Sequence, residues 1–377
     1  MITREILADI KKSLFRGEAV VVVGPRQVGK TTLVETLLRN VPADRVARYN
    51  GDYLADRRDF PIASAREADA RFSGVDYIMV DEAQKIPDVG DSLKILVDRF
   101  GKAKQVIVTG SSTLGLLDHT SEPLTGRKRT YRLFPLSFSE LVTARGQRDA
   151  RATLEETMVF GSYPQVVSQT GEAEKIRKLE DLVSGQLYRD ILEFQDIKNP
   201  DVLARLLELL ALRVGSEVSY HALAQILGVS QQTVEKYVDL LEKSFVVFRV
   251  RPHLSNKGKE VSKMKKVYFY DLGIRNAILR SFGPLRLRTD VGALWENFFI
   301  LERRKNVAYR SLPVEQRFWR TKAQEEVDYL EMGAVLERAF ECKWGGGKYS
   351  PPQAFTNLYP GVSVTMAHPG NALELLK

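Results

Sequence analysis

The residues best suited to chemistry lie near the N-terminus, where two glycines flank four variable positions and are followed by a lysine and a threonine. In this spacing the glycines let the chain curl, so that successive amides point at one phosphate, and the start of a helix favours the anion. The lysine would neutralise the outer phosphate oxygens, and the threonine hydroxyl would join the Mg²⁺ shell. The predicted nucleotide-binding loop is Gly24, Pro25, Arg26, Gln27, Val28, Gly29, Lys30, Thr31 and Thr32.

Two acids that follow an apolar run complete this chemistry. Asp81 is predicted to hold Mg²⁺ together with Thr31, because an acid at the end of the neighbouring strand does so in such sites. Glu82 is predicted to be catalytic, beside Lys30, by orienting and polarising the attacking water; the alternative is a surface acid in an Asp-Glu-Ala-Gln turn. ATP and Mg²⁺ are the expected cofactors. Thr109 and Ser111 end a further apolar run, where they could sense the γ-phosphate.

These residues require elements that bring them together. Short apolar runs at 19–23, 77–80 and 106–108 alternate with helical patterns, which indicates buried strands of a parallel sheet covered on both faces. Ligands bind beyond the carboxyl ends of such strands. All three polar clusters lie at those ends, so we expect them to converge.

Further motifs extend over essentially the whole chain. They are Leu-Thr-Gly-Arg at 124–127, Phe-Pro-Leu-Ser-Phe at 134–138, Gly-Ser-Tyr-Pro at 161–164, Leu-Tyr-Arg-Asp at 187–190, Tyr-Phe-Tyr-Asp-Leu-Gly at 268–273, Trp-Glu-Asn at 295–297 and Phe-Trp-Arg-Thr at 318–321. With the loop, Val-Asp-Glu-Ala-Gln-Lys and Thr-Gly-Ser-Ser, they resemble the AAA+-related ATPase family of bacteria and archaea, whose C-terminal half was catalogued as a domain of unknown function. The resemblance implies ATP binding, ATP hydrolysis and a winged-helix segment. It also makes Arg127 a catalytic arginine finger or sensor, with a structural pairing to a carboxylate as the alternative.

A second set of charged residues lies towards the C-terminus. Glu341 and Lys343 are two apart in a strand and share a face. Asp328 joins them if the hairpin register allows it, and with Glu296 from the preceding helix the set resembles the PD-(D/E)XK nuclease core. Two or three carboxylates could hold a second Mg²⁺ or a Mn²⁺, and the lysine could stabilise hydroxide or the pentacovalent phosphate. A nuclease-like fold that does not cleave is the alternative.

The expected fold class is therefore α/β, in four parts. Residues 1–150 form a P-loop AAA+-like ATPase domain with a parallel sheet, and 151–212 form a helical lid or linker. Residues 213–284 form a winged-helix-like domain, since Gly228 can close one helix and Ser230 can cap the next. Residues 285–377 form a mixed α/β nuclease-like domain.

Charge is concentrated in one stretch. Between Arg249 and Arg288 there are eleven Lys or Arg against two acids, a charge of +9 in a chain whose total is +8. Such a strip is expected of a partner with a phosphate backbone, and a solvated face opposite an acidic part of the same protein is the alternative. The predicted DNA contacts are Arg249, Arg251, Lys257, Lys259, Lys263, Lys265 and Lys266. The second helix of the helix-turn-helix exposes more acid than base, so we expect it to be a scaffold or protein contact.

Composition limits the class of protein and its expected location. With 44% hydrophobic and 28% charged residues, wholesale disorder is excluded, and no apolar run is long enough to cross a bilayer. A single cysteine excludes an internal disulfide, and no secretory signal is visible, so a cytoplasmic protein without a membrane partner is expected. The leading hypothesis is an ATP hydrolase that acts on DNA. The alternative is a nucleotide-controlled switch acting on a protein partner without DNA cleavage. A homo-oligomer would let Arg127 complete a neighbour's site.

Overall fold

The computed structural model describes residues 2–111, 124–187, 197, 199–253 and 264–376. The chain forms two compact units, one ending at Phe134 and the other beginning at Pro135. The first boundary therefore precedes the expected one at 150, and the boundaries expected at 212 and 284 fall inside the second unit. Among the described residues, no helix combines the length and apolar character that a bilayer crossing requires.

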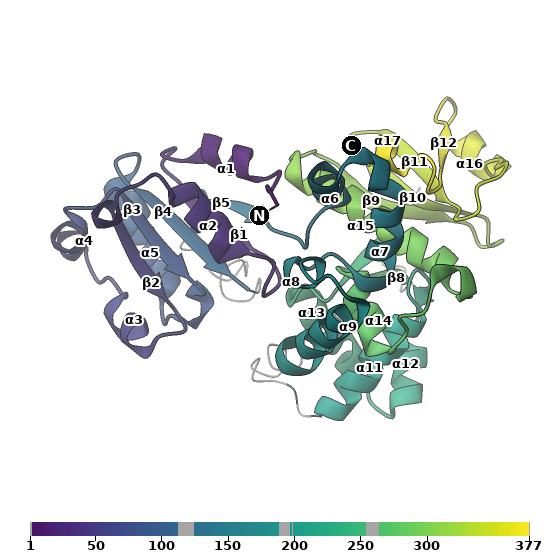
Figure 1. Ribbon diagram of the computed structural model, residues 1–377, viewed down its shortest axis with the longest axis horizontal. Helices are drawn as coiled ribbons and strands as arrows, with labels where there is room; N and C mark the ends of the chain where they lie inside the picture. The colour runs from purple at the N-terminus through teal and green to yellow at the C-terminus, as the bar shows by residue number, and fades with distance from the viewer. Residues whose placement is uncertain (1, 112–123, 188–196, 198, 254–263, 377) are drawn as a thin grey trace. The chain divides into compact units, whose positions relative to one another are not determined.

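The first unit is built on a five-stranded sheet in the order β2-β3-β4-β1-β5, with every neighbouring pair parallel, as predicted. The strands lie side by side in Figure 1. They are β1 (Ala19–Val23), β2 (Val46–Asn50), β3 (Tyr77–Asp81), β4 (Gln105–Gly110) and β5 (Lys128–Arg132). The helices of this unit are α1 (Leu7–Ser13), α2 (Lys30–Leu38), α3 (Leu54–Asp59), α4 (Ala65–Phe72) and α5 (Val89–Phe100). Strands β1 and β4 are buried throughout, which explains their apolar sequences.

The second unit begins with helices α6 (Phe138–Arg145), α7 (Ala150–Phe160), α8 (Pro164–Val167), α9 (Glu172–Asp181) and α11 (Pro200–Leu212). Helices α12 (Tyr220–Leu227) and α13 (Gln231–Lys243) then form the predicted helix-turn-helix. Gly228 ends α12 with a left-handed φ of 68°, and Ser230 caps α13 by accepting a hydrogen bond from the amide of Thr233. Helices α14 (Leu272–Ile278), α15 (Val291–Tyr309), α16 (Gln353–Leu358) and α17 (Ala372–Leu375) follow.

One mixed sheet runs through this unit in the order β12-β11-β10-β9-β7-β8-β6. Its strands are β6 (Glu217–Val218), β7 (Val247–Pro252), β8 (Lys265–Phe269), β9 (Glu315–Arg320), β10 (Glu326–Met332), β11 (Leu336–Cys342) and β12 (Val364–Ala367). The sheet is continuous because β7 pairs in parallel with β9, with Arg251 opposite Arg317. The segments expected as a winged-helix-like and a nuclease-like domain thus share one sheet.

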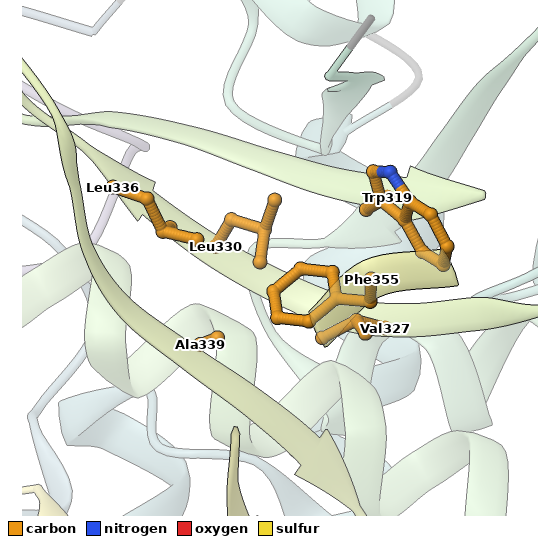
Figure 2. Packing of buried hydrophobic residues seen from close by; sticks show 6 residues of the cluster. All are labelled: Trp319, Val327, Leu330, Leu336, Ala339 and Phe355. Atoms are coloured by element: carbon orange, nitrogen blue, oxygen red, sulfur yellow. The ribbon is translucent and has the colours of Figure 1, made fainter. Parts of the chain in front are cut away.

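An apolar cluster fixes β9, β10 and β11 in place. Figure 2 shows its six buried side chains. The rings of Trp319 and Phe355 meet edge to face, with their centroids 5.3 Å apart. Val327 and Leu330 of β10 contribute from the same strand that carries Asp328, and are fully buried. Asp328 directly follows Val327, so its side chain points to the opposite face of the strand, and a register shift between Val327 and Leu330 interrupts the alternation before Leu330.

Candidate nucleotide site

The predicted loop joins β1 to α2 at the carboxyl edge of the first sheet. Gly24 lies so close to the backbone that a Cβ atom there would be 2.0 Å from the carbonyl oxygen of Leu133, so no other residue fits without a shift of the chain. Gln27 and Gly29 have left-handed φ values of 61° and 91°, which curl the loop before α2 begins at Lys30. The local chain therefore has the curvature that phosphate binding by successive amides requires.

The Lys30 side chain is buried and lies across this loop. Its Nζ donates to the carbonyl oxygens of Gly24 and Pro25 at 3.1 and 2.9 Å, and lies 3.9 Å from Oε1 of Glu82. The ammonium group is thus held between the loop and the second predicted acid. This is the position from which it could neutralise phosphate oxygens.

Asp81 brings together the oxygens that could hold Mg²⁺. Thr31 Oγ1 donates to its Oδ2 at 2.8 Å, Thr109 Oγ1 donates to its Oδ1, and the Glu82 amide approaches Oδ1 at 3.2 Å. A carboxylate next to a threonine hydroxyl at the loop is a hard, all-oxygen donor set. These residues fit the implied Mg²⁺, and Thr109 is placed to orient the carboxylate.

Glu82 has a different surrounding although it follows Asp81 directly. Its φ of 46° is left-handed, which turns the side chain out of the β3 alternation. Its Oε2 accepts from Ser111 Oγ at 2.9 Å and from Gln84 Nε2 at 2.6 Å. Glu82 is thus partnered within the site, unlike a solvated turn acid. Gln84 was not singled out from the sequence, although its position two residues after the acid was the available signal.

Arg4 is a second residue that sequence reasoning missed. Its guanidinium donates to the carbonyl oxygen of Val28 in the loop at 2.8 Å and to that of Phe134 at 2.5 Å. The contact joins the N-terminal segment, the loop and the last residue of the unit. No local sequence pattern predicts this contact, because Arg4 and its partners are far apart in sequence.

Arg127 lies beside the end of β1 that is remote from the loop. Its carbonyl oxygen accepts from the amide of Ala19, the first residue of β1, whereas the loop follows the last residue of that strand. The four steps between the five residues of β1, at about 3.3 Å each, separate the two ends by roughly 13 Å. The Arg127 side chain pairs with Asp98, at 2.6 Å, which agrees with the alternative of a structural carboxylate pair.

Comparison with known families agrees with this geometry. Residues 16–142 match a family model described as an AAA domain. Residues 16–142 are an AAA-type P-loop ATPase domain. The rest of the chain matches two domains of unknown function, DUF8612 over residues 151–284 and DUF4143 over residues 291–368.

Relatives of the whole chain are known in bacteria and archaea. An uncharacterized protein of Mycobacterium tuberculosis is 28% identical over 335 residues, which cover 87% of this chain and 71% of that protein. One of Methanocaldococcus jannaschii is 25% identical over 319 residues, or 74% and 66% of the two chains. Among solved structures, Cdc6p from Pyrobaculum aerophilum has a TM-score of 0.30 at 14% identity, over 74% of this chain and 92% of that one. Pif1 helicase from Candida albicans has a TM-score of 0.28 at 12% identity, over 48% of each.

Outside the ATPase domain, the four residues of the predicted nuclease site do approach one another. The register of β10 and β11 pairs Tyr329 with Phe340, so Asp328 and Glu341 lie opposite each other. Lys343 Nζ is 2.7 Å from Glu341 Oε1. Glu296 on α15 reaches the same region through a shared partner, Lys266.

Lys266 of β8 occupies the middle of these carboxylates. Its Nζ is 2.9 Å from Glu296 Oε1 and 3.7 Å from Asp328 Oδ1, and it also pairs with Glu326. Burial alone would lower the pKa of Lys266, but the three carboxylates together raise it above its ordinary value. Burial and then the charge of Glu296 raise the pKa of Asp328, against the lowering effect of Lys266. The cluster is therefore a buried ion network in which three carboxylates share one ammonium group.

The predicted second metal site is not found. Within the described part of the chain, no group of three or more His, Cys, Asp or Glu side chains has an arrangement that could hold a metal ion. The physical reason is the buried ammonium group of Lys266, which occupies the place among the carboxylates that a cation would take.

Four cations of the basic strip form ion pairs within the second unit. Arg249 pairs with Asp239 and Glu242, while Arg275 and Arg288 share Asp290. Lys266 is buried as well, so the side chains of Arg249 and Lys266 both lie in ion pairs within the second unit, and their contact with DNA stays a prediction. Arg251 is exposed and Lys265 is half-buried over the Tyr220 ring. Lys257, Lys259 and Lys263 lie outside the described residues.

Proposed function

We propose that this protein is a Mg²⁺-dependent ATP hydrolase. The observation that carries the proposal is the pairing of Asp81 with Thr31 at the loop while the next residue, Glu82, is held beside Lys30 by a separate set of donors. Mg²⁺ bound by Asp81 and Thr31 would neutralise charge on the β- and γ-phosphates. Lys30 would leave the loop carbonyls for the phosphate oxygens, and Glu82 would take a proton from the attacking water.

The test is ATP turnover in two site variants and one matched control. Glu82→Gln should still bind ATP but lose turnover by roughly 10²- to 10⁴-fold, the usual contribution of a general base. Lys30→Ala should lose nucleotide binding. Glu18→Gln is the control, because it makes the same glutamate-to-glutamine change as Glu82→Gln in an acid that pairs with Arg129 away from the loop. It should keep both ATP binding and turnover. Rapid turnover by Glu82→Gln would remove this residue from the base role.

DNA is the partner that we propose to test first. The helix-turn-helix, the hairpin of β7 and β8 and the net charge of +8 support a winged-helix-like element with affinity for a phosphate backbone. Of the cations predicted to contact DNA, Arg251 and Lys265 keep some exposure in the described chain. The alternative is a nucleotide-controlled switch for a protein partner.

Measuring ATP turnover with and without DNA distinguishes an enzyme that acts on DNA from a switch that acts on a protein partner. A protein that acts on DNA should hydrolyse ATP faster when single-stranded, duplex or branched DNA is added, and the effect should fall steeply with salt. A switch ATPase should be indifferent to all three. Arg251→Ala should weaken the DNA effect and its salt dependence if DNA is the partner.

For the C-terminal region we propose a nuclease-like arrangement that does not cleave. The support is Lys266, whose buried ammonium group lies among Glu296, Glu326 and Asp328. The protein should therefore leave DNA intact with Mg²⁺ or Mn²⁺ present. Cutting that Asp328→Ala eliminates would overturn this proposal.

A further inference from the structure

We propose that Gln84 is a positioning residue for ATP hydrolysis, which holds the Glu82 carboxylate in the orientation needed to accept a proton from water. The inference rests on the proposed ATPase function. Gln84 lies outside the P-loop and outside the Asp-Glu pair, and three hydrogen bonds link it, Ser111 and Glu82.

The Gln84 amide nitrogen bridges two groups of the site. Its Nε2 donates to Glu82 Oε2 at 2.6 Å and to Ser111 Oγ at 2.9 Å, and Ser111 in turn donates to the same Glu82 oxygen at 2.9 Å. The three side chains form a closed ring. Since both partners of the nitrogen accept hydrogen bonds, the reversed amide would place its oxygen against the carboxylate, so the orientation of the amide is determined chemically.

The ring of hydrogen bonds contacts Oε2 of Glu82 and leaves Oε1 for proton transfer. Glu82 Oε1 is turned towards Lys30, at 3.9 Å from its ammonium nitrogen. A carboxylate fixed through Oε2 cannot rotate freely, which keeps Oε1 at the phosphate edge. In the reaction, the water oxygen bonds to the γ-phosphorus as the bond to the β–γ bridging oxygen breaks, and one water proton passes to Glu82.

The other end of the Gln84 amide argues against a purely structural role. Its Oε1 is buried and has no hydrogen-bond partner among the described residues. A glutamine retained for packing would be expected to satisfy both ends of its amide. Here, within the part of the chain that the structure describes, the hydrogen bonds of the satisfied end go to the predicted base and to Ser111 after β4.

Gln84→Leu tests the inference, because it keeps the approximate size of the side chain and removes the hydrogen bonds. We expect kcat for ATP to fall roughly ten- to a hundredfold, with KM and the affinity for ATP within about twofold of wild type, since part of the general-base effect of 10²–10⁴ is lost. Gln225→Leu makes the same change at an exposed position of α12 and should leave kcat unchanged.

A double-mutant cycle distinguishes positioning from a general disturbance. In a Glu82→Gln background, Gln84→Leu should have no further effect on kcat, because the group that it positions is already gone. An equal loss in both backgrounds, or a wild-type kcat in Gln84→Leu, overturns the inference. If Gln84→Leu fails to fold, Ser111→Ala, which opens the same ring, must show the same non-additivity with Glu82→Gln. A wild-type protein without ATP turnover would refute the proposed function itself.

Discussion

Two adjacent acids, Asp81 and Glu82, have different surroundings because their backbones differ. Asp81 ends β3 in regular extended conformation and accepts from hydroxyls of Thr31 and Thr109, which come from elements on either side. Glu82 has a left-handed φ, and this places its carboxylate among Ser111, Gln84 and Lys30. Residues in such conformations persist where surrounding contacts hold them, and they concentrate at active sites. The proposed metal ligand and the proposed base can therefore occupy two consecutive positions.

The first glycine of the loop provides a prediction at the residue scale. Gly24→Ala would place a Cβ 2.0 Å from the Leu133 carbonyl oxygen, a backbone atom that cannot rotate away. We expect a loss of stability of about 1–3 kcal/mol, as for other overpacked sites, together with weaker ATP binding. Denaturant unfolding and nucleotide titration measure the two effects. Gly74→Ala is the matched control, because nothing lies within 4 Å of its added Cβ. Equal behaviour of the two variants would contradict the steric argument.

At the scale of elements, the continuous sheet of the second unit is organised around Lys266. Strand β8 contributes this lysine, β10 contributes Glu326 and Asp328, and α15 contributes Glu296. Arg320 of β9 adds a further link, with Glu217 and Glu326 each at 3.2 Å. Since these partners come from distant parts of the sequence, the network ties the two matched domains of unknown function into one folded body.

Removing the central ammonium tests this interpretation. Lys266→Met would leave Glu296, Glu326 and Asp328 facing one another in a buried site, so we expect a loss of about 3–5 kcal/mol in the unfolding free energy of the second unit. Lys265→Met is the control, because alternation places that residue on the other face of the strand and it is only half-buried. Chemical denaturation should separate the variants clearly. A Lys266→Met protein as stable as Lys265→Met would show that the network does not depend on the lysine.

This network also marks the limit of what the sequence could predict. The loop, the parallel sheet, Gly228 and Ser230 were predictable because their signals are local: residue type, short spacing and periodicity. Lys265 and Lys266 look alike in sequence, yet one lies near the surface and the other is buried among partners at least thirty positions away. Strand β5 was likewise missed, because its sequence, Lys-Arg-Thr-Tyr-Arg, carries no apolar run; pairing with β1 makes it a strand.

Asp290, at the start of α15, gives the second unit a defined response to acid. The hydrogen bond from Arg288, and then the charge of Arg275, lower the pKa of Asp290 from 3.8 to about 2. Because the folded pKa is below the unfolded one, the contribution to stability is complete above about pH 4 and is lost as the pH falls towards 2. Asp290→Asn should cost roughly 1–3 kcal/mol at neutral pH, since Arg275 stays buried without its carboxylate. It should also flatten the unfolding free energy between pH 4 and 2.

The control for this prediction is Asp181→Asn, at an exposed acid ending α9. Its acid dependence should match that of the wild type. If Asp290→Asn retained the full wild-type slope, the acid response would have to come from other carboxylates.

At the scale of the whole molecule, the chain divides after Phe134 into two units with separate sheets and separate chemistry. The predicted ATP and Mg²⁺ ligands all belong to the first unit, and the Lys266 network belongs to the second. Ligand binding stabilises only the folded unit that binds it. Variants of the nucleotide site and variants of the Lys266 network should therefore change different parts of the unfolding curve.

Calorimetry of the full chain should accordingly show two transitions. ATP with Mg²⁺ at 100 times its Kd should stabilise one of them by about 2.7 kcal/mol, the value for a single site, and Asp81→Asn should remove that shift. Lys266→Met should lower the other transition and leave the nucleotide shift intact. Limited proteolysis then assigns each transition, because fragments from before and after Phe134 should appear at different temperatures. A single transition that responds equally to nucleotide and to Lys266→Met would mean that the two units unfold as one, and would refute their thermodynamic independence.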